Sequence, residues 1–106
     1  MARKRLNYAQ LFLLQRNFEK IAEIFDHKFD LGLLYPNRRR FHVTEFIGFM
    51  GVVGPYFLGI GERDLARNVY QMMKDISPDH PLTEQFGLEL NAGALTRWLR
   101  RLVGRR

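Results

Sequence analysis

Arginine is the residue type in this chain whose clustering points most clearly to a chemistry. Three arginines are consecutive at Arg38–Arg40, and residues 91–106 hold five arginines and no acidic residue. Guanidinium groups pair with phosphate and carboxylate oxygens, and clusters of them attract polyanions through counterion release. We therefore expect a partner with many negative charges, which is either a nucleic acid (DNA or RNA) or an acidic protein surface.

Aromatic residues flank the first arginine cluster. Tyr35 precedes Arg38, Arg39 and Arg40, and Phe41 follows them directly. Proteins hold single-stranded nucleic acids by stacking bases on aromatic rings and by pairing phosphates with cations. Tyr35 and the three arginines are therefore a candidate nucleic-acid site. An acidic protein surface would fit the same residues, and so would a turn that is simply solvated.

The second cluster lies on an expected C-terminal helix that begins at Asn91. Apolar residues recur at the spacing of one helix face, namely Leu95, Trp98, Leu99 and Leu102. Arginines crowd the remaining positions, so this helix could contact phosphates, a membrane surface or a partner protein. The candidate nucleic-acid contacts on this helix are Arg97, Trp98, Arg100, Arg101 and Arg105.

Residues 82–101 resemble a helix-turn-helix at the level of the motif alone. A short helix over 83–86 would end at Gly87, and a second helix with Trp98 and the arginines would follow. In that motif the second helix enters the major groove of DNA. The connection between the two expected helices is longer than the usual turn of three or four residues.

Catalytic patterns do not stand out in this sequence. The chain has no cysteine, which excludes a disulfide scaffold, a thiol nucleophile and cysteine-ligated metal. His27, His42 and His80 do not have the spacing of metal ligands, and no Ser/His/Asp or paired-carboxylate pattern is present. We predict a binding protein that is not an enzyme and needs no cofactor or metal.

The net charge alternates along the chain. Residues 1–40 hold nine Lys/Arg and four Asp/Glu, residues 41–90 hold three and seven, and the remainder is purely basic. The acidic middle favours a second class of function, a protein–protein adaptor or inhibitor that docks on a larger protein through helical and aromatic surfaces. The acidic middle could also pair with the basic ends of a second copy and give a homodimer.

Length and composition predict one small globular domain over residues 1–106. Hydrophobic residues make up 46% of the 106 residues, which excludes a wholly disordered chain. The uncharged run over residues 46–61 is shorter than a membrane span and rich in glycine, so we expect a buried core segment. Polar residues interrupt the apolar stretch after Arg5, so we expect no signal peptide and a cytoplasmic protein.

The first expected helix begins at an Asn7 cap and ends at Gly32. Its apolar stripe comprises Leu11, Leu14, Phe18, Ile21, Ala22, Phe25 and Phe29. Residues 33–43 then form either a short β-hairpin or an irregular loop that presents the three arginines. Pro36-Asn37 suits the centre of a β-turn in both alternatives.

The second half of the chain predicts three further elements. A helix capped by Thr44 should end near Gly54-Pro55, and its glycines should mark the close approach of a neighbouring helix. A helix after Gly61 should bury Leu65, Val69, Met72 and Ile76. With the helical turn over 83–86 and the helix from Asn91, the prediction is a mainly α, compact domain of four to five helices.

Overall fold

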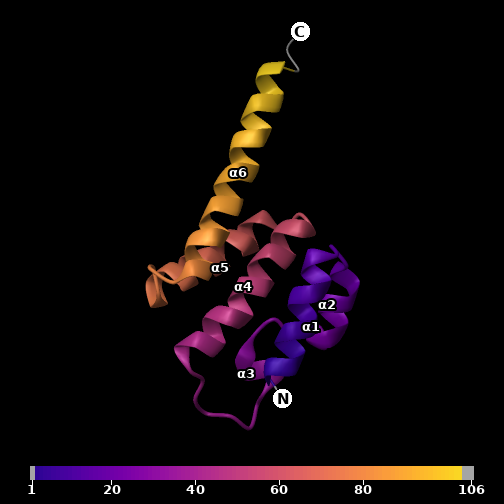
Figure 1. The fold of residues 1–106 in the computed structure, drawn as a ribbon, viewed down its shortest axis with the longest axis vertical. Coiled ribbons are helices and arrows are strands. Elements are labelled where there is room, and N and C mark those ends of the chain that lie inside the picture. Colours follow the sequence, from indigo (N-terminus) through magenta and orange to yellow (C-terminus); the bar gives the residue numbers. More distant parts are fainter. Residues whose placement is uncertain (1, 104–106) are drawn as a thin grey trace.

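The computed structural model describes the backbone of residues 2–103 and the side chains of residues 4–92. The described chain forms six helices and no strand: α1 (Ala2–Leu14), α2 (Phe18–Ile24), α3 (Leu31–Leu34), α4 (Val43–Gly59), α5 (Arg63–Ile76) and α6 (Pro81–Val103). Figure 1 shows them along a molecule of 56 × 29 × 19 Å. The all-α prediction is confirmed, whereas the expected count of four to five helices is wrong.

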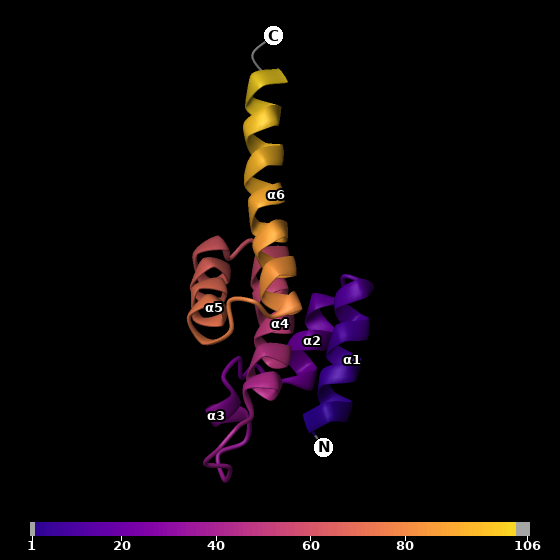
Figure 2. The ribbon, with the colours of Figure 1, turned by 60° about the vertical axis from the view of Figure 1, so that its left-hand side comes forward.

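Helix α4 lies at the centre of the fold. Helices α1, α5 and α6 all pack against it, and α2 adds a smaller contact (Figure 2). Its side chains at Ile47, Phe49, Val52 and Val53 are buried in the core. The prediction that the uncharged run is a buried core segment is therefore confirmed.

Helix α4 is longer than predicted at both ends. It begins at Val43, with His42 rather than Thr44 at the cap position, and it continues through Pro55 to Gly59. A residue before proline is normally pushed out of the helical region, partly by its Cβ, and Gly54 has none. Phe86 of α6 lies so close to Gly54 that a Cβ there would overlap its ring. The close approach expected at the glycines is thus confirmed at Gly54.

The single helix expected between Asn7 and Gly32 is wrong. Helix α1 already includes Asn7 and ends at Leu14, where Arg16 adopts φ +55°. The N–H of Asn17 donates to the Phe12 carbonyl (2.8 Å), which is the long hydrogen bond of a Schellman motif. Asn17 then caps α2 by accepting from the Lys20 N–H at 3.4 Å. The chain therefore reverses and α1 packs against α2, which leaves Leu11 and Leu14 exposed.

The β-hairpin expected at residues 33–43 is not formed. Helix α2 ends in a second Schellman motif, in which the His27 N–H donates to the Ala22 carbonyl (2.8 Å). Asp30 then caps the short helix α3, because its carboxylate accepts from the Gly32 N–H at 2.7 Å. That helical turn uses the residues that a first strand would need and buries Leu31. An irregular loop follows, which is the other predicted alternative.

Helix α5 begins after Gly61 as predicted but is rotated relative to the expected stripe. Its buried residues are Ala66, Val69 and Met73. The other three members of the predicted stripe are each at least 41% exposed: Leu65, Met72 and Ile76. The small Ala66 side chain, which is fully buried, lets the helix approach the core closely on this side.

Helix α6 is continuous from Pro81 to Val103, so the predicted break between residues 87 and 91 is wrong. A helix-turn-helix over residues 82–101 is excluded, because its turn does not exist. Gly87 lies inside the helix where Tyr70 packs against it, and a Cβ there would be 2.7 Å from the Tyr70 hydroxyl oxygen. The first half of α6 contacts α4 and α5, and its later backbone extends beyond the other helices (Figures 1 and 2).

Candidate nucleic-acid interface

The loop that carries the three arginines starts with a tight turn. The Arg38 N–H donates to the Tyr35 carbonyl at 3.1 Å, with Pro36 and Asn37 in the centre as predicted. Residues 38–42 have no regular secondary structure, and Arg38–Arg40 are all exposed. The loop lies at one end of the long axis (Figure 1), and its three consecutive arginine side chains are exposed to solvent there.

Arg38 differs from its two neighbours because it forms an ion pair with Glu45 in the first turn of α4. Its guanidinium donates to both carboxylate oxygens of Glu45, one of them at 2.7 Å, and to the Arg40 carbonyl at 3.3 Å. These hydrogen bonds lower the pKa of Glu45 and raise the pKa of Arg38. Arg38 thus holds the loop on α4, and Arg39 and Arg40 are the residues left for a partner.

Glu45 also stabilises the start of α4. One of its carboxylate oxygens accepts from the His42 N–H at 3.3 Å, the return bond of a capping box. The negative side chain lies in the first helical turn, where the helix dipole favours it. One carboxylate therefore connects the loop to a helix end and fixes where the arginines project.

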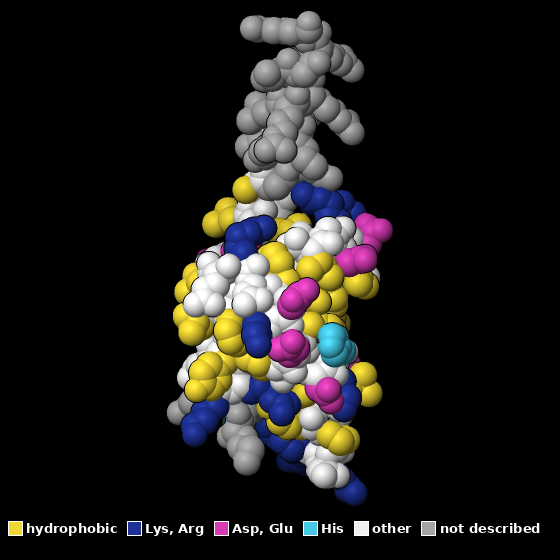
Figure 3. Space-filling model, turned by 90° about the vertical axis from the view of Figure 1, so that its right-hand side faces the viewer, with side chains coloured by type: hydrophobic (Ala, Val, Ile, Leu, Met, Phe, Trp, Pro, Cys, Tyr) yellow, Lys and Arg dark blue, Asp and Glu magenta, His cyan; other side chains and the backbone are white. Residues whose placement is uncertain are grey.

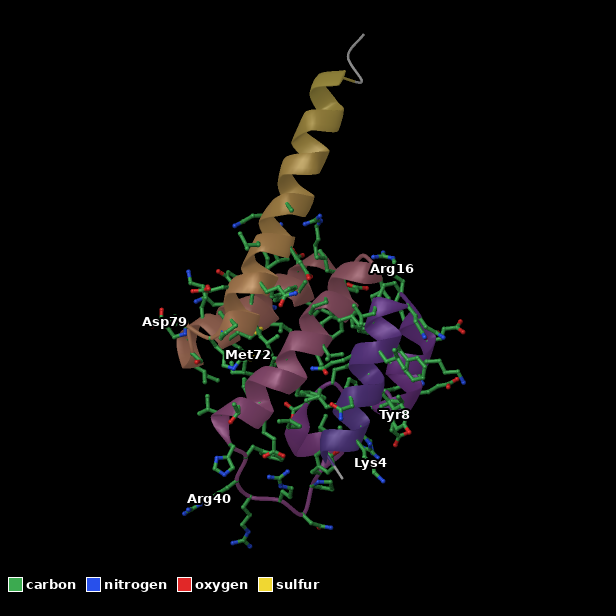
Figure 4. The ribbon with its side chains drawn as sticks, in the orientation of Figure 1. Lys4, Tyr8, Arg16, Arg40, Met72 and Asp79 are labelled. Carbon is green, nitrogen blue, oxygen red and sulfur yellow. The ribbon has the colours of Figure 1, made fainter. Side chains whose placement is uncertain are left out.

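The N-terminus of α1 brings two more basic residues to the loop. The Arg5 guanidinium lies over the Tyr35 ring at 5.5 Å from its centroid, and Lys4 precedes it with an exposed side chain. Figure 4 labels Lys4 and Arg40 at the same end of the molecule. We call this region the basic end, and it comprises Lys4, Arg5, Tyr35, Arg38, Arg39 and Arg40.

The surface of the basic end mixes cationic and apolar groups. Figure 3 shows dark-blue side chains gathered toward the lower end of one face, with apolar side chains between them. The Arg38 guanidinium lies over the Phe41 ring at 4.5 Å from its centroid. The two aromatic rings at this end, Tyr35 and Phe41, therefore each have an arginine against one face. Such contacts orient a guanidinium against the face of the ring.

A cavity opens beside Tyr35 and Arg5. Its volume is about 380 Å³, and buried core side chains close its floor: Phe25, Leu31 and Phe49. Leu6 and Leu34 form part of its wall. The polar groups of the cavity come from five further lining residues: Arg5, Tyr35, His42, Thr44 and Glu45.

The C-terminal cluster is not brought together with the basic end. The backbone of residues 97–101 belongs to α6 and lies at the opposite end of the long axis from the loop (Figure 1). The side chains of Arg97, Trp98, Arg100 and Arg101 lie outside the described residues, and so does the whole of Arg105.

The sequence did not identify Arg5, Glu45 or the cavity as parts of the site. A basic run at residues 3–5 is visible in the sequence, but its position beside Tyr35 depends on the reversal between α1 and α2. Glu45 gave a weaker signal, since an acidic residue three positions after a helix cap is typical of a capping box.

Three further observations concern the described part of the chain. No group of three or more histidine or acidic side chains there could hold a metal ion. No helix within it is long and apolar enough to cross a membrane. Comparison of the chain with protein-family models, with curated proteins and with solved structures found no match.

Proposed function

We propose that this chain binds nucleic acid without catalysis and that the basic end makes the main contact. The observation that carries the proposal is that Arg5 of α1 lies over the Tyr35 ring, next to the loop that exposes Arg39 and Arg40. Two distant parts of the sequence thus bring cationic side chains to the same end of the molecule, where Lys4 is also exposed (Figure 4). Phosphates would pair with the cations, and this electrostatic contact would supply most of the affinity.

The form of the basic end favours a single strand over a duplex. Arg38–Arg40 project from an irregular loop, and the short helix α3 next to that loop is too short to fill a major groove. The continuous helix α6 removes the turn that a helix-turn-helix would need. Aromatic rings beside cations are the recurrent means of holding unpaired bases.

The second arginine cluster adds a separate proposed contact. By its position in the sequence, this cluster belongs to the far part of α6 and the residues just after it. It comprises Arg97, Trp98, Arg100, Arg101 and Arg105. Because that part of α6 is at the other end of a molecule about 56 Å long, it would bind a different stretch of polyanion. We therefore treat this cluster as an independent contributor to affinity.

The experiment compares four ligands of similar charge by fluorescence anisotropy with the full chain. These are a single-stranded RNA, a single-stranded DNA, the corresponding duplex DNA and poly-glutamate. We expect the single strands to bind most tightly and log Kd to rise steeply with log salt, by about 0.7 per neutralised phosphate. Failure of every nucleic acid to bind at low salt would refute the proposed function.

A second candidate function, docking to protein, is favoured by one surface of α5. Met72 and Ile76 follow Leu65 by 7 and 11 residues, so the three side chains lie on one face of the helix. Each of them is at least 41% exposed. Asp64 and Asp75 lie next to this apolar row. The partner that fits is the basic and apolar sequence of α6 from a second copy, which would give a homodimer.

The homodimer has its own test. Leu65→Glu and Met72→Glu place charges in the exposed row of α5, so they should shift a dimer to monomer in analytical ultracentrifugation. A wild-type chain that stays monomeric at high concentration would remove this candidate.

Tight binding of poly-glutamate in preference to RNA would instead favour an acidic protein partner at the basic end.

A further inference from the structure

We propose that the cavity beside Tyr35 is a pocket for one unpaired nucleobase of the bound strand. The inference rests on the proposed function and assigns the cavity a ligand of defined chemistry. Its volume of about 380 Å³ lies within the range of ligand pockets, which begins near 300 Å³. A single base is flat and largely apolar on its faces, so it suits a pocket of this kind.

The lining of the cavity matches the two chemical characters of a base. Phe25, Leu31 and Phe49 form an apolar floor and are each at most 6% exposed, so the pocket reaches the core. His42 and Thr44 carry polar atoms suited to the hydrogen-bonding edge of a base. A base in this pocket would therefore remove apolar surface from water and keep its polar edge hydrogen-bonded.

The surroundings of the cavity argue for a polymer of phosphates rather than a small carboxylic acid. Arg5 lies at the cavity itself, and Arg39 and Arg40 follow Arg38, which is paired with the cavity residue Glu45. A small carboxylate would use one guanidinium, whereas a strand places a phosphate on each side of every base. A more open hollow of about 500 Å³ beside Phe18 has Glu19 and Glu23 in its lining, so it does not suit a polyanion.

A pocket that takes one base explains why strandedness should matter. In a duplex the bases are stacked and paired, and entry into a cavity requires that one base be unpaired and unstacked, which costs free energy. A single strand pays little of this cost. Preference for a single strand is therefore a consequence of the cavity, while attraction by the arginines alone would accept either form.

The decisive experiment compares a single-stranded oligonucleotide with an abasic oligonucleotide of the same length and charge. We expect the loss of bases to weaken binding of the wild-type chain about tenfold, within the range seen when base contacts to aromatic side chains are removed. Equal affinity for the two oligonucleotides would overturn the pocket and leave the proposed function intact. Failure of both to bind at low salt would overturn the proposed function, and the pocket with it.

A matched pair of variants locates the effect at the cavity. Leu34→Trp fills part of the pocket from its wall, and Leu33→Trp makes the same change at an exposed neighbour on α3 that does not line the cavity. We expect Leu34→Trp to bind the normal oligonucleotide about tenfold more weakly and the abasic one as wild type does. A folded Leu34→Trp variant with wild-type affinity would overturn the pocket. If that variant does not fold, equal affinity of the wild-type chain for the two oligonucleotides still overturns the pocket.

Discussion

The basic end and the crossing of α4 with α6 are stabilised by different forces. At the crossing, the Phe86 side chain is only 2% exposed, and its ring fills the space that Gly54 leaves open. At the basic end, an exposed ion pair between Arg38 and Glu45 fixes an irregular loop. The crossing gains stability from buried apolar area, whereas the basic end collects like charges that repel one another without a partner.

This difference predicts that folding and binding can be separated by mutation. Substitutions at the crossing should lower the free energy of unfolding and should affect binding only through loss of the fold. Substitutions of Arg39 and Arg40 should weaken binding and leave the fold intact. A polyanion should also raise the melting temperature, because it binds the folded chain and relieves repulsion at the basic end.

The largest expected effect is at the crossing. Phe86→Ala removes a ring that packs edge-on against Tyr70, with the ring centroids 6.1 Å apart, and fills the space beside Gly54. We expect a loss of about 3–5 kcal/mol in the free energy of unfolding, measured by urea denaturation. Leu88→Ala on the same helix is the control, since Leu88 is 70% exposed and should change stability by less than about 0.5 kcal/mol. Similar losses in both variants would contradict the assigned packing of α6.

The next effect concerns binding. Arg39→Ala with Arg40→Ala should weaken single-strand binding about tenfold at low salt and make the salt dependence shallower, because two phosphate contacts are lost. The melting temperature should not change, since both side chains are exposed.

The control for that pair is Arg63→Ala with Arg67→Ala, which removes the same charge from α5. The Arg67 side chain is 62% exposed and its partner Asp64 is on the same helix, so a nucleic acid at the basic end would not need it. Equal weakening by both pairs would show that net charge, and not the basic end, determines affinity.

A smaller effect on stability is expected at Thr83 in the first turn of α6. Its side chain is buried, and its hydroxyl oxygen has no hydrogen-bond partner among the described residues. Thr83→Val keeps the branched shape and removes the unpaired group, so the free energy of unfolding should rise by about 1 kcal/mol. Thr83→Ser retains the hydroxyl and loses the methyl group, and it should be less stable than wild type. A destabilised Thr83→Val would mean that the hydroxyl does find a partner.

The smallest expected effect is the pH dependence of the ion pair at the basic end. The hydrogen bonds from Arg38 lower the pKa of Glu45 below the ordinary value of a glutamate, so the pair stabilises the fold at any pH above that ordinary value. This contribution is lost as the pH falls from the ordinary pKa of Glu45 in the unfolded chain to its lowered pKa in the folded chain. Glu45→Gln should therefore lose less stability than wild type between pH 6 and pH 3 in thermal melts. Parallel curves would show that the pair adds no stability.

The sequence predicted elements whose signals are local. Pro36-Asn37 indicated the turn, the uncharged run indicated the central segment, and Gly61 preceded a helix start as expected. The reversal between α1 and α2 was missed because Arg16, not a glycine, takes the left-handed position that ends α1. The continuity of α6 was missed because Gly87 serves close packing with Tyr70 and makes no turn.

The candidate site was predictable only in its exposed part. The arginine cluster and Tyr35 were identified because consecutive cations beside an aromatic residue form a pattern in one short segment. Arg5 and the cavity depend on contacts between α1, α3 and α4, which no local pattern encodes. The commitment of Arg38 to Glu45 likewise depends on how the loop returns to α4, so the three arginines looked equivalent in the sequence.

The most direct test of the account is a map of where a single strand touches the chain. In two-dimensional NMR of the ¹⁵N-labelled protein with a short single-stranded RNA, we predict amide shifts at residues 4–6, 34–35 and 38–45, and at residues 97–105 from the separate contact proposed there. Residues 63–76 of α5 should be unaffected at the same ratios. Shifts confined to α5, or spread evenly over all exposed basic residues, would contradict a nucleic-acid site at the basic end.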